Sequence, residues 1–599
     1  MGSAEWRWAR IGVCPMRAKG KAGMGAVPVV LQPFDRLTCE LIQYSGLLVD
    51  WLIPEDLPAR VATLDILITI GEGELEDDSA HALQAFVQQG GIWIALGGVC
   101  AQPQLFGVHP RLHREGTIQR LGEGYAVGSP SNPVLPEKWG MLHGFGGVAV
   151  DAQEGTVWAH WLDAHGRETG LPAIVHRAHG TGHAILFAVH PGESITRIRH
   201  GRSVVEPAVL PPDVERDPDD HALRAEDAIH LDWHLDREPF EGGYGFLKPV
   251  ADLWQESLIR AVLWGGQQRG AVVPMLWFYP DHLPGVAILS IDAEPSAASH
   301  ELTLQRLLTL TGVRAVWCLS EVSHEPVFYR ELAKRGHEIG LRYVPEPAAF
   351  CRAATLQNQV DNLRRFSGVR AITAVQVADL HWRGCTEFYA YAEQAQILSD
   401  LSRGGYATGA AGFAFGSAHP WRPLNHARPG ELHALHVVPL LGYHLIERVS
   451  SGQAQAILRM AQAVHGVCHF TVRPTVVENE AKADAFVRML AAARNAGYEW
   501  ITAAELARWH TARTAVRHRF TGVMGQMQLA LLSSTALSRL TLLLFTPLSG
   551  WAQTGSNELP LKPAEHFGYP CLVLETDLVE KTVREITLFE AQEAQASGM

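Results

Sequence analysis

The sequence predicts an α/β protein made of several domains. Residues 26–205 and residues 272–510 each alternate short apolar runs with stretches of helical periodicity, and glycine-rich turns follow several of the runs. Strands that alternate with helices in this way form parallel sheets with helices on their faces. A third region, residues 515–590, has short apolar runs separated by turn residues, which predicts a small all-β cap.

The composition argues against several classes of protein. With 599 residues the chain is too long for one ordinary core, and the 50 Lys and Arg against 63 Asp and Glu are scattered along it, which argues against a nucleic-acid partner. The eight cysteines include no CxxC pair, a pattern that favours reduced thiols in a cytoplasmic protein. Ser, Thr and Arg539 interrupt the apolar stretch 527–545, so no membrane span is predicted. The oligomeric state stays open.

Residues 1–25 are basic and lack the apolar core of a signal peptide, so we predict a disordered tail and a cytoplasmic location. After this tail, the runs "VPVVLQPF", "LDILITIG", "IWIALGG" and "GHAILFAVH" predict the strands of a flavodoxin-like parallel sheet over residues 26–205. Helical stretches separate several of these runs, as a parallel sheet requires.

Within this first domain, the segment 64–98, "LDILITIGEGELEDDSAHALQAFVQQGGIWIALGG", resembles the class I glutamine amidotransferase-like fold. The resemblance implies a nucleophilic cysteine on the turn after a strand, which would be Cys100, and a base at His190. Glu193 lies one place beyond the family's His-x-Glu spacing, and Gln102 stands where the family has glycine. A buried small thiol beside a turn histidine is the alternative interpretation.

Residues 206–271 predict a connector followed by a linking helix. The segment is acidic and rich in Pro and Gly, and its run 217–236, "DPDDHALRAEDAIHLDWHLD", offers Asp and His at many spacings. A charged, solvated loop is the more frequent meaning of such a run than a metal cluster.

Residues 272–510 predict a distorted β/α barrel. A strand at "GVAILSIDAEP" is followed by the helix "ELTLQRLLTLTG", the strand "VRAVWCLS", the helix "PVFYRELAKRG" and the strand turn "HEIGLR". In such folds the functional groups lie where the strands end.

The segments "LSIDAEP", "GVRAVWCLS" and "LAKRGHEIGLR" occur in the order and spacing of polysaccharide deacetylases with a NodB-homology domain, and this resemblance covers residues 284–510. It implies hydrolysis of a carbon–nitrogen bond, the removal of an acetyl group from an amino sugar or related carbohydrate. In that family one Asp acts as the base, and an adjacent Asp with two histidines holds a metal. A later histidine protonates the leaving amine.

Matched residue by residue, the resemblance implies a degenerate metal site. Asp292 matches the catalytic base, but Ala293 occupies the position of the metal-binding Asp. Arg342 stands where the first metal-binding His is expected, Glu346 where the second would lie, and Arg473 where the late His would come. Arginine is cationic at any relevant pH and does not coordinate metals.

Arg342 has two possible roles. Its charge would replace that of the metal, either by pairing with Asp292 or Glu294 or by holding a substrate carboxylate or phosphate in a bidentate fork. The alternative is a solvent-facing side chain or a purely structural ion pair.

A rebuilt zinc-like site also stays open, because carboxylates with imidazole suit zinc or manganese. Its candidate ligands are Asp292, Glu294, His337, His381 and His419. Two tryptophans, Trp382 and Trp421, lie beside the last two histidines in loops and are candidates for stacking on a sugar ring, or for anchoring the core. The cofactor is otherwise unknown.

These interpretations of the motifs lead to three hypotheses about function. The first is a deacetylase-like hydrolase in which Asp292 is the base, and the second is a catalytically inactive protein of the same fold, a pseudoenzyme that binds carbohydrate or acts as a scaffold. The third places the activity in the first domain, as a Cys100-dependent amide hydrolase. The sequence leaves open whether the protein is an enzyme.

Overall fold

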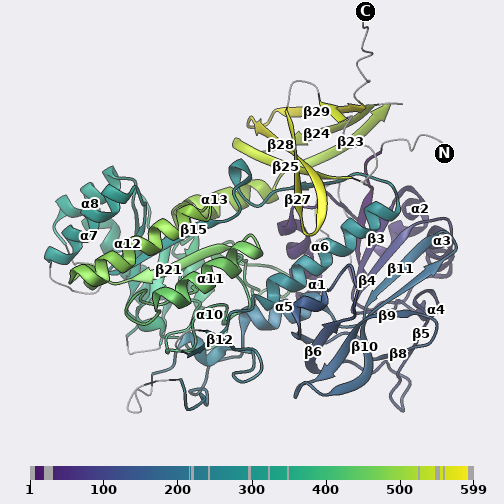
Figure 1. Ribbon diagram of the computed structural model, residues 1–599, viewed down its shortest axis with the longest axis horizontal. Helices are drawn as coiled ribbons and strands as arrows, with labels where there is room; N and C mark the ends of the chain where they lie inside the picture. The colour runs from purple at the N-terminus through teal and green to yellow at the C-terminus, as the bar shows by residue number, and fades with distance from the viewer. Residues whose placement is uncertain are drawn as a thin grey trace, which may run out of the picture. The chain divides into compact units, whose positions relative to one another are not determined.

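A computed structural model describes most of the chain, namely residues 7–18, 31–214, 216, 222–240, 243–293, 298–320, 324–346, 350–523, 526–546, 554–556 and 560–590. The chain divides into two compact units, coloured along the sequence in Figure 1. The first comprises Met1–Ser194, Trp254–His282 and His510–Met599, and the second comprises Ile195–Leu253 and Leu283–Trp509.

A nine-stranded sheet forms the core of the first unit, in the order β2-β1-β3-β4-β11-β10-β9-β6-β7. Its parallel half comprises β1 (Ile11–Pro15), β2 (Asp50–Trp51), β3 (Ile66–Ile70), β4 (Ile92–Leu96) and β11 (Gly182–Phe187). Every residue of β1, β3 and β4 is buried, as expected for parallel strands covered on both faces. The α/β class is therefore confirmed for this unit.

The other half of the sheet is antiparallel, which the sequence analysis did not predict. It comprises β6 (Glu123–Gly128), β7 (Leu142–Phe145), β9 (Thr156–Asp163) and β10 (Glu168–His179). These strands mix buried and half-buried positions, so they lack the continuous apolar runs by which the parallel strands were recognised. The two short strands β5 (Val108–Pro110) and β8 (Val150–Ala152) pair separately.

The helices of the first unit connect these strands. They are α1 (Pro33–Ser45), α2 (Leu57–Arg60), α3 (Asp77–Gln88) and α4 (Pro103–Phe106), and the chain continues through α5 (Pro191–His200) and α6 (Val250–Gln268). Proline stands at the start of α1, where its missing N–H costs no helical hydrogen bond.

The prediction of a disordered tail over residues 1–25 is wrong for residues 11–15. Residues 11–15 form β1, a fully buried strand that pairs with β2 on one side and β3 on the other. Five apolar residues between basic stretches are too short a signal to recognise without their sheet partners. Of the strand predicted at "VPVVLQPF", residues 27–34, the first four residues lie outside the described residues, and the last two belong to α1, which begins at Pro33.

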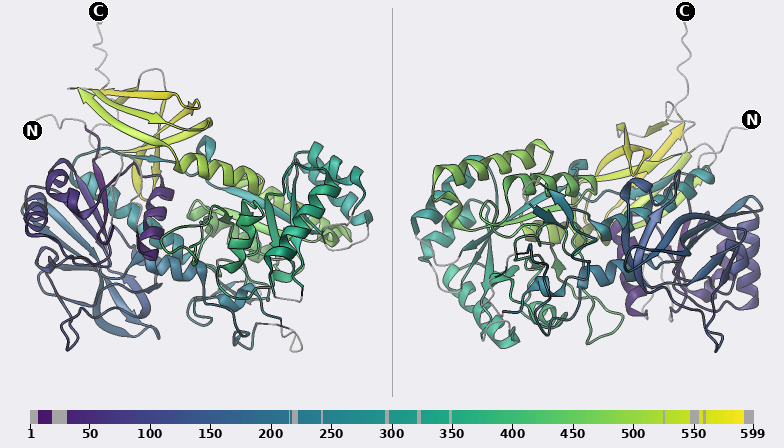
Figure 2. Two further views of the ribbon diagram at one scale, coloured as in Figure 1. Left: turned by 180° about the vertical axis from the view of Figure 1, so that it is seen from behind. Right: turned by 60° about the horizontal axis from the view of Figure 1, so that its bottom comes forward.

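Two four-stranded antiparallel sheets complete the first unit, and Figure 2 shows their C-terminal strands in yellow and yellow-green. One contains β14 (Val273–Leu276), β25 (Leu537–Phe545), β28 (Tyr569–Leu578) and β27 (Leu561–His566); the other contains β23 (Arg517–Val523), β24 (Gln526–Leu532), β29 (Val583–Glu590) and β26 (Thr554–Ser556). Residues 273–276 pair with β25, so they are not part of the barrel predicted over 272–510. Among the described residues, no helix has the length and apolar character needed to cross a bilayer.

An open, half-barrel parallel sheet forms the core of the second unit, in the order β20-β19-β18-β17-β16-β15-β21, with β22 paired to β15. The strands are β15 (Val286–Ala293), β16 (Val316–Leu319), β17 (Glu338–Tyr343), β18 (Ala374–Val377), β19 (Ser399–Asp400), β20 (His436–Val437), β21 (Val467–Val472) and β22 (Glu499–Trp500). All of these pairings are parallel.

The helices of the second unit follow its strands, as the sequence pattern predicts. They are α7 (Ala298–Thr311), α8 (Pro326–Lys334), α9 (Ala353–Ser367), α10 (Glu387–Gln394), α11 (Ser451–Ala463) and α12 (Glu480–Asn495). The chain continues through α13 (Ala503–Thr514), whose residues from His510 onward belong to the first unit. Ser450 and Asn479 cap α11 and α12, because each side-chain oxygen accepts a backbone N–H of the first turn.

The connector predicted over 206–271 is not simply a solvated loop where the structure describes it. Glu226 is fully buried, and its carboxylate accepts the backbone N–H groups of Tyr406 and Ala407. The short strands β12 (Glu238–Phe240) and β13 (Gly243–Gly245) pair with each other in the same segment. Acidic residues looked solvated in the sequence because their buried partners lie about 180 residues away.

Candidate functional site

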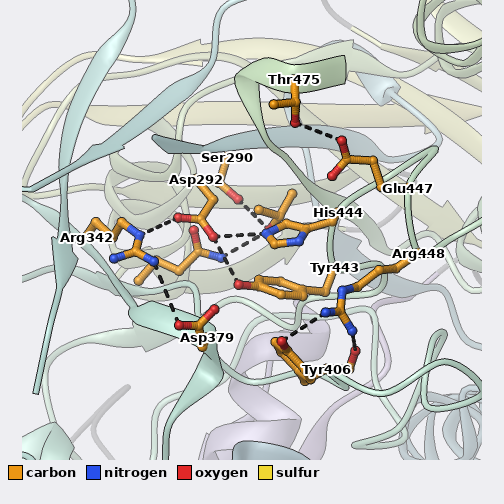
Figure 3. Close-up of polar contacts among 12 residues, drawn as sticks. Ser290, Asp292, Arg342, Asp379, Tyr406, Tyr443, His444, Glu447, Arg448 and Thr475 are labelled. Atoms are coloured by element: carbon orange, nitrogen blue, oxygen red, sulfur yellow. Dashed lines mark hydrogen bonds and ion pairs between the residues drawn. The ribbon is translucent and has the colours of Figure 1, made fainter. Parts of the chain in front are cut away.

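The candidate site lies at the carboxyl end of the parallel sheet of the second unit. Asp292 is the seventh residue of β15, and Arg342 is the fifth of β17, two strands away in the sheet. Carboxyl ends of parallel strands are where open α/β sheets place their ligands. Figure 3 shows Asp292 at the centre of a group of polar side chains that includes Arg342.

Asp292 and Arg342 form a buried ion pair. The Nε of Arg342 donates to Oδ1 of Asp292 at 2.7 Å, and the two side chains are only 9% and 2% exposed. A second carboxylate, that of Asp379, lies 4.0 Å from Nη2 of Arg342. The structure therefore brings together two residues that the sequence analysis placed at strand ends.

The second oxygen of Asp292 accepts two further hydrogen bonds. The hydroxyl of Tyr443 and the Nε2 of His444 both lie 3.0 Å from Oδ2. Tyr443 and His444 also stack on each other, with ring centroids 3.7 Å apart. Both oxygens of the carboxylate are thus engaged by protein donors.

These contacts determine the charge of the site. Burial alone would raise the pKa of Asp292, but the hydrogen bond from His444 and the charge of Arg342 hold that pKa at about 2. Burial lowers the pKa of His444, although Asp292 works against this shift. At neutral pH, Asp292 is therefore ionised, His444 is a neutral donor through Nε2–H, and Arg342 supplies the counter-charge.

A layer of buried polar side chains surrounds Ser290, which lies two residues before Asp292 on β15. The hydroxyl of Ser290 lies 2.9 Å from Nε2 of His469 and 3.0 Å from the hydroxyl of Thr471, which also accepts from Gln376. Nδ1 of His469 lies 3.2 Å from the carbonyl oxygen of Pro439, and burial lowers the pKa of His469 to about 4. This neutral, hydrogen-bonded layer joins β15, β18 and β21 beneath the ion pair.

At the edge of the site, two arginine side chains lie against the ring of Tyr406. The guanidinium carbons of Arg224 and Arg448 lie 3.6 and 4.1 Å from the ring centroid of Tyr406, and Nη2 of Arg448 donates to the Tyr406 hydroxyl at 2.9 Å. Figure 3 shows Tyr406 and Arg448 side by side next to Tyr443. Such cation–π contacts add to the rigidity of the side chains that face outward.

Two loops at the site have strained backbones. Asp379, which follows β18, has φ of 51°, and His444 has φ of 53°. Left-handed conformations of residues other than glycine are uncommon and cluster at functional sites. The strain lies in the two loops whose side chains contact Arg342 and Asp292.

The predicted metal ligands are not gathered around Asp292. His419 is buried, with Nε2 lying 2.8 Å from the carbonyl oxygen of Val464, and His381 follows β18 in a loop whose backbone pairs with Arg224. Glu294 lies outside the described residues. Within the described ranges, no three His, Cys, Asp or Glu side chains are grouped to hold an ion. Since the Arg342 guanidinium lies 2.7 Å from Asp292, the described residues around this carboxylate do not fit a metal centre.

The two tryptophans proposed to stack on a sugar are core residues. Trp382 and Trp421 are each 1% exposed. The guanidinium of Arg403 lies over the Trp382 ring at 4.7 Å, and that of Arg199 over the Trp421 ring at 5.6 Å. Their burial agrees with the core-anchoring alternative, because neither indole presents a face to a ligand.

Cys100, the candidate nucleophile of the first unit, is fully buried on a strained turn with φ of 48°. Burial raises the pKa of its thiol, and the carboxylate of Glu72 accepts the adjacent backbone N–H of Val99 at 2.7 Å. His190 is also buried, and burial lowers its pKa to about 4. A buried neutral thiol is a poor nucleophile, so the structure favours the small-thiol alternative.

We therefore expect Cys100 to resist alkylation in the folded protein. Treatment with iodoacetamide at pH 7, followed by mass spectrometry, should leave Cys100 unmodified over a period in which a free cysteine added to the same sample reacts fully. Cys100 should react in urea. Modification of native Cys100 at the rate of an unfolded thiol would restore the amide hydrolase hypothesis.

Tyr443 and His444 are the site residues that sequence reasoning missed. They stand in "LLGYHLIE", and His444 is 152 residues from the Asp292 that it contacts. A Tyr-His pair after a short apolar run belongs to no motif considered above. A histidine following Gly-Tyr near a strand end is the only local signal.

Comparisons with known proteins give weak matches. No protein-family model matches the sequence, and no curated protein matches it. A putative polysaccharide deacetylase involved in O-antigen biosynthesis from Bordetella bronchiseptica is 17% identical over 39% of this chain and 88% of that one, with a TM-score of 0.24. A mutant CE4 family pseudoenzyme with restored enzymatic activity is 12% identical over 38% of this chain and 70% of that one, with a TM-score of 0.25.

A β-galactosidase from Bacillus circulans sp. alkalophilus is 13% identical over 30% of this chain, with a TM-score of 0.23, and the match spans 28% of the length of that enzyme. At these identities and TM-scores, the solved structures carry no argument about the activity of this chain.

Proposed function

We propose that the second unit binds a carbohydrate at the carboxyl end of its parallel sheet without hydrolysing it. The observation that carries this proposal is the engagement of both Asp292 oxygens by Arg342, Tyr443 and His444. The carbohydrate part rests on the ordered resemblance of residues 284–510 to polysaccharide deacetylases.

Asp292 is poorly suited to act as a general base. A base must accept a proton from water, and it works best when its pKa lies near the operating pH. The pKa of Asp292 is about 2, and its two oxygens already accept three hydrogen bonds. The residue that the resemblance assigns to catalysis therefore stabilises the site.

Arg342 supplies positive charge beside Asp292, as a bound metal ion does in the resembled family. Its fixed positive charge lies beside the carboxylate that would otherwise face a cation, so the buried pair is neutral as a whole. The resulting site has no ligand set for an ion in the described residues, yet it keeps an ordered polar surface.

The side chains available to a sugar lie at the outer edge of this group. The Asp379 side chain is 32% exposed, and Arg448 and Tyr406 are half-buried. A carboxylate accepts hydrogen bonds from sugar hydroxyls, and a guanidinium donates to ring and hydroxyl oxygens. We therefore assign Asp379 and Arg448 as the contacts to the sugar.

The test combines binding and turnover. Calorimetric titration with an N-acetylglucosamine pentamer should detect binding, and an acetate-release assay, run with and without added zinc, should detect no turnover. Asp379→Asn should weaken binding about tenfold, because it removes a charged acceptor. Asp361→Asn is the matched control, since that carboxylate lies on α9 and pairs with Arg364. A chain that binds neither the pentamer nor its deacetylated form would contradict the proposal.

Hydrolysis of the N-acetyl bond is the second candidate function, and one observation favours it. Nδ1 of His444 has no hydrogen-bond partner among the described residues, whereas Nε2 is oriented by Asp292. A carboxylate that orients an imidazole leaves the other ring nitrogen as the base. Because His444 is fully buried, this base would act only on a substrate that reaches into the site. Acetate release that disappears in His444→Gln would support this candidate over simple binding.

A further inference from the structure

Arg513, in the last turn of α13, is a buried cation of the first unit that forms no ion pair with any described carboxylate. Its side chain is among the largest fully buried ones, at 1% exposure. Nη1 donates to the carbonyl oxygen of Leu276 at 3.1 Å, and Nη2 donates to the carbonyl oxygen of Tyr44. Nε has no hydrogen-bond partner among the described residues.

Neutral groups compensate this charge only in part. Two rings, Tyr44 and Phe278, lie 5.3 and 5.5 Å from the guanidinium carbon of Arg513, and the Tyr44 carbonyl lies at the negative end of the α1 dipole. Burial nevertheless lowers the pKa of Arg513 to about 10. Burying a cation without a formal counter-charge costs several kcal/mol in general.

A cavity of about 210 Å³ lies beside Arg513, and its wall combines apolar residues with a group of polar and cationic ones. Arg517, His518 and Gln43 line it together with Arg513. Arg517 is an exposed residue and forms no ion pair within the described part of the chain. No Asp or Glu among the described residues lines this cavity.

A second cavity of about 370 Å³ adjoins the first, since Ala515 and Arg517 line both. Its wall includes the side chains of Ser533, Ser534 and Lys581, and Lys581 pairs with Glu580 at 2.9 Å. Hydroxyls and cations are the groups with which proteins recognise phosphate. Together the two cavities reach the size of ordinary small-molecule sites.

We propose that the first unit binds a phosphate-class anion in the cavity walled by Arg513, Arg517 and His518. Arg513 and Arg517 both line the cavity and carry fixed positive charges, and a phosphate dianion matches two cations better than a carboxylate does. The adjoining cavity accommodates whatever the phosphoryl group is attached to. The ligand is free phosphate or a phosphorylated sugar, which share this chemistry.

The competing explanation for Arg513 is a purely structural cap. Arginine hydrogen-bonds the last carbonyls of helices, and Arg513 does so at the end of α1. Arg517 has no such role, because its side chain makes no hydrogen bond or ion pair within the described ranges. The experiment therefore uses Arg517 first and Arg513 second.

Calorimetric titration of the full chain with inorganic phosphate, and separately with glucose 1-phosphate and glucose, tests the site. We expect the wild type to bind phosphate with a Kd below about 1 mM in low-salt buffer. Arg517→Gln should weaken this affinity at least about tenfold. Arg519→Gln is the matched control: Arg519 is exposed two residues along β23, lines neither cavity, and should leave the affinity unchanged.

Comparing the titrations with phosphate and with glucose 1-phosphate identifies the source of the phosphoryl group. Tighter binding of glucose 1-phosphate than of phosphate supports a site that continues into the adjoining cavity, whereas equal affinities support recognition of the phosphoryl group alone. Three results would overturn the proposal: no phosphate binding up to about 10 mM, equal weakening in Arg517→Gln and Arg519→Gln, or a folded Arg513→Met variant that binds phosphate like the wild type.

Discussion

Replacing Asp292 with alanine is expected to lower the free energy of unfolding of the second unit by about 3–5 kcal/mol. The change leaves the guanidinium of Arg342 buried without its carboxylate and deprives Tyr443 and His444 of their shared acceptor. The cost of an unpaired buried charge exceeds the worth of the pair itself. Urea unfolding followed by circular dichroism measures the difference.

Two variants make this result interpretable. The double change Asp292→Ala with Arg342→Met should be less destabilising than Asp292→Ala alone, because no unpaired charge stays buried. Asp361→Ala breaks the exposed pair between Asp361 and Arg364, 2.8 Å apart, and should cost less than about 1 kcal/mol. If Asp292→Ala costs no more than Asp361→Ala, the ion pair does not hold the site together.

Acidification is expected to destabilise the second unit through its buried histidines. Burial lowers the pKa of His200 to about 3 and those of His436 and His469 to about 4. Since an unfolded histidine titrates near 6.5, the unfolded chain takes up these protons first as the pH falls. The stability is fully present above about pH 6.5 and falls as the pH drops towards 4, by about 2 kcal/mol per histidine between pH 6.5 and 5.

Buried carboxylates with raised pKa values, namely Asp400, Glu226 and Glu338, oppose this slope, whereas Asp292 does not affect it. Burial raises the pKa of Asp400 to about 6, so Asp400 opposes one histidine between pH 6 and 4. The stability that ionised Asp292 contributes does not change through this range. Its pKa is about 2 in the folded protein and near 3.9 in the unfolded chain, so this stability is lost only below about pH 3.9. The net expectation is still a loss of stability on acidification.

Urea unfolding at pH 7.5, 6.5 and 5.5 checks this prediction. His469→Gln should reduce the pH dependence by about one proton, because glutamine cannot take up a proton in the unfolded chain. His426→Gln is the matched control, since His426 is exposed, and its slope should equal that of the wild type. A flat stability profile from pH 7.5 to 5.5 would contradict the buried-histidine account.

The alternation of apolar runs and helical stretches was sufficient to predict the two parallel sheets. The runs around β3, β4, β15 and β16 are continuous because both faces of these strands are buried. The pattern also placed Asp292 at a strand end. It did not predict β1 or the antiparallel half of the first sheet, whose signals are short or interrupted by exposed positions.

The chemistry of Asp292 depended on contacts that no local pattern records. The sequence gives the identity of Asp292 and predicts its place near the end of a strand, β15. It also shows an arginine, Arg342, where the resembled family has a histidine. Whether that arginine faces solvent or the carboxylate is a matter of packing between strands. The same holds for Trp382 and Trp421, which look available in a loop and are buried in the folded unit.

Local periodicity reports which residues share a face of an element, so the sequence was enough for the fold class, and it also showed Ala293 and Arg342 where the resembled family has metal ligands. Only the tertiary structure decided what contacts Asp292, because the donors that hold its carboxylate come from positions 50, 151 and 152 residues away. Burial, not residue type, then sets the pKa of Asp292 and makes the carboxylate part of the scaffold.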